Sequence, residues 1–246
     1  MIRESQLEGV MADRVQEILP VYAVTPFTML DYPGKAACIV WLAGCNMRCA
    51  YCHNPQIVRS KGRNEIGKVL AFLERRRGLL DGVVLSGGEA TLYPGLLSFA
   101  EHVKAMGFAV KLDTNGTRPA AIRSLLAAGV LDFVALDFKA PVKKFQAITG
   151  LQGWCGFSET LDMLLARHGY SCEIRTTIHS DLLDESDVNA IIYDLDVRGY
   201  DGVYYLQNFK ADNERPTLGA LRPQSRLFDI SSIATPKNFR LAFRNF

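Results

Sequence analysis

The chain has 246 residues, of which 48% are hydrophobic and 22% charged, which is enough material for one large globular domain or two small ones. A net charge of +2 is too balanced for a nucleic-acid-binding surface, so we expect no nucleic-acid partner. The sequence has no run of about 20 apolar residues that predicts a membrane span and no apolar signal core near its start, so we expect a cytoplasmic protein with no membrane partner.

Short apolar runs alternate with helix-like stretches along most of the chain. After a leader that can form one amphipathic helix up to Pro20, we expect strands at 36–42, 82–86, 109–113, 133–137, 172–178 and 202–207. Helices are expected at 65–77, 95–106, 119–128, 157–168 and 185–196. Parallel neighbours need helical crossovers, so this order predicts an α/β fold with a parallel sheet. Periodicity alone does not distinguish an incomplete, laterally open barrel from a doubly wound sheet.

The loop after the first predicted strand holds three cysteines in the sequence GCNMRCAYC. They are Cys45, Cys49 and Cys52. Thiolates are soft ligands that select zinc, copper(I) or an iron–sulfur cluster. A structural zinc ion is normally four-coordinate and would need Cys38, His53 or a distant residue as its fourth ligand. A [4Fe-4S] cluster held by three cysteines keeps one iron open for another ligand, so we favour the cluster over zinc and over an inert cysteine-rich loop.

Polar residues and glycines follow the next predicted strands at the same edge of the sheet. They are Ser86, Gly87, Gly88 and Glu89, then Asp113, Thr114 and Asn115, then Asp137 and Lys139, and finally Arg175. Taken alone, each segment also has an ordinary structural explanation, either a turn or a surface ion pair. In α/β proteins, however, the carboxyl edge of the strands is the active face, so we expect these residues to meet the cysteine loop there.

The C-x₃-C-x₂-C loop and the Ser-Gly-Gly-Glu segment together resemble the radical S-adenosylmethionine superfamily. The resemblance implies a [4Fe-4S] cluster on the three cysteines, with S-adenosylmethionine chelating the open iron. It further implies that Tyr51 lies against the adenine and that the Gly-Gly-Glu segment holds the methionine ammonium group. We therefore expect an α/β partial (β/α)6 TIM-like barrel, laterally open, with an N-terminal helical extension.

The DTNG and LDFK segments are similar to those of glycyl-radical-enzyme activating enzymes. In that branch they supply a monovalent-cation site beside the cofactor carboxylate. That site falls here on Asp113, Thr114, the Ala135 carbonyl and Asp137. The full set of cofactor-binding residues implied by the resemblance is Tyr51, Ser86, Gly87, Gly88, Glu89, Asp113, Thr114, Asn115, Asp137, Lys139 and Arg175.

The segment LDYPGK before the first strand resembles an activase segment whose aspartate contacts the partner enzyme, which makes Asp31 a candidate partner-binding residue. With the cysteine loop, it most resembles the activating proteins of anaerobic ribonucleoside-triphosphate reductase. The implied partners are a glycyl radical enzyme and a flavodoxin or ferredoxin that donates the electron. Two alternatives remain open, namely a radical enzyme acting on a small molecule, as 7-carboxy-7-deazaguanine synthase does, and a non-catalytic zinc-binding module.

Three further expectations concern the organisation of the chain. We expect an extension at 1–21, the barrel domain at 22–210 and a tail at 211–246 that packs on the barrel. Related activases carry a histidine near the sixth strand end, where this chain offers only Gln207 and Asn208. Cys155 and Cys172 are expected to be buried core thiols.

Overall fold

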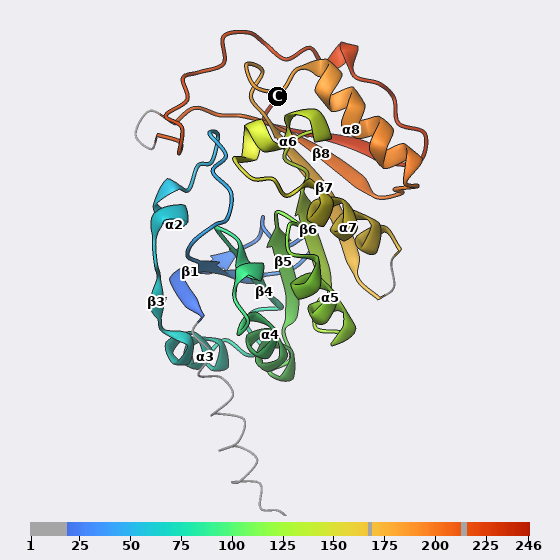
Figure 1. Cartoon of the computed structure of the whole chain (residues 1–246). Coiled ribbons are helices and arrows are strands. Elements are labelled where there is room, and N and C mark those ends of the chain that lie inside the picture. Colours follow the sequence, from blue (N-terminus) through green and yellow to red (C-terminus); the bar gives the residue numbers. More distant parts are fainter. Residues whose placement is uncertain (1–18, 167–168, 213–215) are drawn as a thin grey trace, which may run out of the picture.

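The computed structural model describes residues 19–166, 169–212 and 216–246, and the helix expected in the leader lies outside these ranges. A single sheet of nine strands forms the centre, in the order β3-β1-β2-β4-β5-β6-β7-β8-β9. The strands are β1 (Pro20–Thr28), β2 (Ala37–Leu42), β3 (Arg63–Asn64), β4 (Gly82–Gly87), β5 (Ala109–Thr114), β6 (Phe133–Asp137), β7 (Ser171–Ile178), β8 (Val203–Asn208) and β9 (Arg240–Arg244). Figure 1 shows the twisted sheet passing from β1 and β3 on one side to β8 on the other.

Strands β2 and β4 to β9 are parallel, whereas β1 runs antiparallel to both β2 and β3. Helices form most of the crossovers between the parallel strands (Figure 1). They are α2 (Pro55–Arg59), α3 (Ile66–Glu74), α4 (Leu96–Ala105), α5 (Pro119–Ala127), α6 (Val142–Thr149), α7 (Trp154–Leu165) and α8 (Glu185–Val197), with short 3-10 turns at η1 (Ala90–Leu92) and η2 (Ile230–Ser232). None of the helices within the described ranges has the length and apolar character that crossing a bilayer requires.

The two faces of the sheet have different surroundings. Side chains alternate along each strand, and Val83, Leu85 and Leu112 point to the face where the helices pack, all fully buried in the main core. The alternate positions point to the opposite, inner face, which carries a smaller apolar cluster near the amino ends of the strands. Because both faces are covered over most of their length, the central strands are short, nearly continuous apolar runs.

The sheet does not close on itself, since β3 and β9 are its two outer strands. The expected laterally open, partial TIM-like barrel is therefore confirmed. The six predicted strands are all present, but β1, β3 and β9 were not predicted. β1 contains two prolines and β9 has only five residues after a long irregular stretch, so neither has a strong strand pattern. The segment expected as a tail thus contributes the last strand of the sheet.

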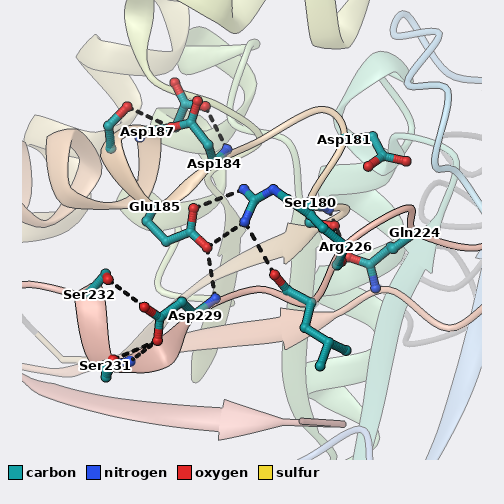
Figure 2. A network of polar contacts seen from close by, with 12 residues as sticks. Ser180, Asp181, Asp184, Glu185, Asp187, Gln224, Arg226, Asp229, Ser231 and Ser232 are labelled. Carbon is teal, nitrogen blue, oxygen red and sulfur yellow. Dashed lines mark hydrogen bonds and ion pairs between the residues drawn. The ribbon is translucent and has the colours of Figure 1, made fainter.

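A C-terminal strap, residues 217–229, connects η2 and β9 to the carboxyl edge of the sheet. Figure 2 shows its attachment to the start of α8, where Arg226 Nη1 and Nη2 donate to the two Glu185 oxygens at 2.7 and 2.8 Å. The Asp229 amide donates to the same carboxylate at 2.7 Å. Nearer β7, the Ser180 amide donates to Gln224 Oε1 at 2.7 Å. The strap is held by individual hydrogen bonds and one ion pair rather than by regular secondary structure.

Candidate active site

A pocket of about 230 Å³ lies at the carboxyl edge of the parallel strands. Its walls come from five strand ends and from the loop after β2. It is lined by Trp41, Cys45, Met47, Cys49, Tyr51, Cys52, His53, Asn54, Val58, Ser86, Gly87, Gly88, Glu89, Asp113, Thr114, Asn115, Asp137, Lys139, Arg175 and Thr177. Every residue predicted for the cluster and the cofactor is in this set, so the structure brings all of them to one cavity.

The cysteine loop begins at Gly44, whose φ of +79° is a backbone conformation that favours glycine. A Cβ at this position would meet the Tyr93 hydroxyl at 2.7 Å, and that hydroxyl donates to the Ala43 carbonyl at 2.5 Å. The Gly44 amide donates to the Ile57 carbonyl at 2.8 Å, and its own carbonyl accepts from the Glu89 amide at 2.9 Å. The base of the loop is therefore fixed by α2 on one side and by the segment after β4 on the other.

The far side of the loop is held by two other segments. The Arg48 amide donates to the Thr149 carbonyl at the end of α6, at 2.7 Å. In the strap, the Leu218 amide donates to the Cys52 carbonyl and the Gly219 amide to the Ala50 carbonyl, both at 2.9 Å. Between the first two cysteines, Met47 lines the pocket and Asn46 contacts the segment after β5, whereas Arg48 is exposed.

The three loop thiols are free and partly or fully buried. Burial raises the pKa of Cys45 to about 11 and also raises the pKa of Cys49, while the ammonium group of Lys139 opposes both shifts. Metal binding requires thiolates, so a metal centre here would release protons on binding. No three His, Cys, Asp or Glu side chains of the described residues are arranged around the position of a single metal ion. Three soft donors on one loop at the edge of a cavity fit the larger iron–sulfur cluster.

Gly87, the last residue of β4, and Gly88, which follows it, have no room for a side chain. A Cβ on Gly87 would lie 2.1 Å from the Leu42 carbonyl oxygen, and one on Gly88 would lie 1.9 Å from the Gly44 carbonyl oxygen. Gly88 would also meet Cys45 Cβ at 3.1 Å. The glycine pair therefore allows the backbone after β4 to pack directly against the cysteine loop, in addition to leaving its pocket side uncovered.

Glu89 is 1% exposed, and its carboxylate accepts four hydrogen bonds from the protein. The Thr91 amide and hydroxyl and the Thr114 hydroxyl donate to Oε1, and the Asn115 amide donates to Oε2 at 2.7 Å. Burial raises the pKa of Glu89, and these hydrogen bonds oppose the shift. The carboxylate therefore connects the segment after β4 to the segment after β5. Its expected contact with a methionine ammonium group stays a prediction.

Charged side chains on neighbouring strands form one ion-pair network on the inner face. Arg175 Nε lies 3.0 Å from Asp137 Oδ1, and Lys139 Nζ lies 3.1 Å from Asp137 Oδ2. Burial alone would raise the pKa of Asp137, but the two cations outweigh it and lower this pKa to about 2. The same pairs raise the pKa values of Lys139 and Arg175. Arg175 also reaches Asp113, at 3.7 Å, which joins β5 to the same network.

Several residues of the site were missed from the sequence. Two of them could have been found from strand alternation. Trp41 lies beside the predicted Ser86 on the neighbouring strand β4, and Thr177 lies two residues after the predicted Arg175, so both share the face of a predicted residue. Lys111 is 1% exposed and pairs with Asp113, which the same alternation indicates. Asn46 has no such signal. Its amide donates to Thr117, and its oxygen accepts from Asn115, which links the cysteine loop to β5.

Asp31, the candidate partner-binding residue, does not line this pocket. It lies in the turn before β2, whereas the pocket lies beyond the other end of that strand, about 20 Å away for six residues at about 3.3 Å each. Its carboxylate accepts from the Thr28 hydroxyl at 2.6 Å. Gln207 and Asn208 are likewise not among the described lining residues. The expectation of two buried core thiols is half wrong, because Cys155 is exposed near the start of α7, whereas Cys172 in β7 is buried.

Comparison with known proteins agrees with this geometry. Residues 39–189 match the family model of the Radical SAM superfamily. The chain is 33% identical over 181 residues to a putative glycyl-radical enzyme activating enzyme of Methanocaldococcus jannaschii, covering 70% of this chain and 73% of the relative. It is 30% identical over 175 residues to the pyruvate formate-lyase-activating enzyme of Clostridium pasteurianum, covering 68% and 71%.

Among solved structures, Streptococcus suis SuiB bound to S-adenosylmethionine superposes with a TM-score of 0.62 at 12% identity. The match covers 82% of this chain and 48% of that one, and it shows the fold alone. Because the family model covers more than half of the chain and both relatives are matched over two thirds of their length, the assignment follows from sequence as well as from fold. The chain is an enzyme that belongs to the radical SAM superfamily and is homologous to glycyl-radical-enzyme activating enzymes.

Proposed function

We propose that this enzyme activates a glycyl radical enzyme, specifically an anaerobic ribonucleoside-triphosphate reductase. The observation that carries the proposal is the joining of three free thiols, a side-chain-free glycine pair and a cationic network in one pocket at the edge of an open barrel. The activase relatives, matched over two thirds of the chain, support the reaction class. The LDYPGK segment is the sequence feature that favours the reductase as partner.

In this proposal Cys45, Cys49 and Cys52 hold the [4Fe-4S] cluster and the strand ends hold S-adenosylmethionine. When bound, the cluster supplies the electron that cleaves S-adenosylmethionine to methionine and a 5′-deoxyadenosyl radical, which takes an α-hydrogen from a glycine of the partner. Lys139 and Arg175 bind the cofactor carboxylate by charge, and their existing ion pairs hold them in place for it. Tyr51, 3% exposed beneath Lys139, forms the wall for the adenine.

The open side of the barrel suits a macromolecular substrate, because a loop of a folded partner must reach the pocket from outside. The electron comes from a flavodoxin or ferredoxin in this scheme. Asp31 remains a candidate contact for the partner at the amino end of the strands, where the turn before β2 is exposed.

The proposal is tested by reconstituting the cluster anaerobically, reducing it and measuring 5′-deoxyadenosine by chromatography. Cys49→Ala is expected to lose both iron and 5′-deoxyadenosine, because it removes one of three ligands. Cys155→Ala is the matched control, since that cysteine is exposed and outside the pocket. Undiminished release by Cys49→Ala would overturn the cluster assignment.

The partner is tested with anaerobic ribonucleoside-triphosphate reductase and electron paramagnetic resonance. The expected result is a glycyl radical signal on the reductase that needs both S-adenosylmethionine and the reduced activase. A protein that releases 5′-deoxyadenosine yet gives no radical on the reductase would refute the assigned partner. A small-molecule substrate, as for 7-carboxy-7-deazaguanine synthase, would then be the next candidate to assay.

A further inference from the structure

The two aspartates expected to hold a monovalent cation, Asp113 and Asp137, have no free carboxylate oxygen for one in this structure. Such an ion is held by oxygen atoms, chiefly carboxylates and carbonyls. All four carboxylate oxygens of Asp113 and Asp137 already have protein partners. Asp137 is paired with Arg175 and Lys139, and Asp113 Oδ2 accepts from the Ser86 hydroxyl at 3.2 Å. The remaining oxygen, Asp113 Oδ1, lies 2.5 Å from the ammonium group of Lys111.

Lys111 belongs to the inner face of the barrel. It lies two residues before Asp113 in β5, so strand alternation places both side chains on that face. The lysine is 1% exposed, and its ammonium group lies 5.6 Å from the centre of the Phe133 ring. A buried ammonium group without a counter-ion costs several kcal/mol. Lys111 is therefore held to Asp113, whereas Arg175 and Lys139 are more exposed and share Asp137.

The charges on this face also make a metal ion unnecessary. Three cationic side chains, Lys111, Lys139 and Arg175, face two aspartates, so one positive charge is left over for an anionic ligand. Glu173, also on this face, is paired with Arg244 at 3.6 Å and with Arg175 at 3.7 Å, which leaves that balance unchanged. The carboxylate of S-adenosylmethionine would complete the neutralisation without a further cation.

We propose that the ammonium group of Lys111 takes the place of a monovalent metal ion beside Asp113, so that the enzyme binds S-adenosylmethionine independently of potassium or sodium. The consequence for S-adenosylmethionine binding rests on the proposed function. The replacement of the metal ion by an ammonium group concerns only Lys111 and Asp113. A substitution that removes the ammonium group should open an oxygen-lined cation site where the wild type has none.

The direct test is anomalous diffraction from crystals soaked in thallium(I), a heavy mimic of potassium. We expect no thallium peak beside Asp113 in the wild type and in Lys111→Arg, which keeps the charge, and a peak there in Lys111→Met. If Lys111→Met does not fold, Lys111→Gln is expected to behave the same way. A peak at this position in the wild type, or none in the folded neutral variant, overturns the inference. This result does not depend on whether the proposed function is correct.

The second test is calorimetric titration of the reconstituted enzyme with S-adenosylmethionine, in potassium chloride and in N-methylglucamine chloride of equal ionic strength. The wild type should bind S-adenosylmethionine with the same affinity in both salts. Lys111→Met should bind it about tenfold more tightly in potassium chloride than in N-methylglucamine chloride, a difference of about 1.4 kcal/mol. A wild type that binds only in potassium refutes the replacement and leaves the proposed function intact.

Discussion

Gly88→Ala should damage the cysteine loop before any cofactor is bound. The added Cβ would lie 1.9 Å from the Gly44 carbonyl oxygen, and relieving that contact to 3.0 Å requires a shift of about 1.1 Å. Neither partner can rotate away, because the clash is with backbone. The shift also weakens the hydrogen bond from the Glu89 amide to the same carbonyl, which lowers the free energy of unfolding by about 1 kcal/mol. Overpacking adds about 1–3 kcal/mol, so we expect a total loss of about 2–4 kcal/mol in the free energy of unfolding.

The measurement is anaerobic urea unfolding of the reduced apoprotein, followed by circular dichroism, with iron content determined after reconstitution. Gly67→Ala in α3 is the matched control, because nothing lies within 4 Å of its Cβ position and alanine favours a helix by about 1 kcal/mol. A displacement of about 1 Å at a reacting centre typically costs about 100-fold in rate, so 5′-deoxyadenosine release should fall by that order. Unfolding energy and iron content equal to those of Gly67→Ala would refute the reasoning.

Two further predictions concern the ion pairs. The pKa of Asp137 is lowered to about 2, so its ion pairs stabilise the fold fully above about pH 4 and are lost as the pH falls towards 2. Their contribution to the free energy of unfolding is about 2 kcal/mol at most. Arg175→Gln should make unfolding less dependent on pH in that window, and urea titrations at pH 3 and 6 that match the wild type would count against it. Arg226→Ala removes the two bonds to Glu185, so hydrogen exchange at 217–226 should accelerate by about tenfold relative to Arg226→Lys, which keeps one contact. Exchange in Arg226→Ala as slow as in the wild type would contradict an anchoring role for this pair.

The sequence was sufficient for the parallel core and for most of the pocket, for a physical reason. Strands β2 and β4 to β8 are largely apolar runs separated by helices, and such runs fold into parallel sheets whose carboxyl ends share one edge. Each site segment immediately follows or ends such a run, so its place in the fold was determined by local pattern. Asp31 precedes a strand, which is why the structure places it at the opposite end of β2.

The residues that sequence reasoning missed depend on contacts between distant segments. Strand β1 has prolines at positions 20 and 26 and is kept in the sheet by its antiparallel pairing with β2. Ser180 and Gln224 are 44 residues apart, and no periodic pattern predicts that the strap returns to β7. Lys111 lies inside a predicted strand, and strand alternation gives the face of its side chain but not that the face is buried.

The strap helps to fix the geometry of the cysteine loop. Gly88 and α6 lie within residues 39–189, the part of the chain that matches the superfamily, and both contact the loop. The hydrogen bonds from Leu218 and Gly219 come from outside that part, and a Cβ on Gly219 would lie 2.6 Å from Ala50 Cβ. The part that matches the superfamily therefore supplies the supports from α2, Gly88 and α6, and the strap, outside that part, supplies another. Relatives that differ after residue 189 can keep all three cysteines and still hold the loop differently.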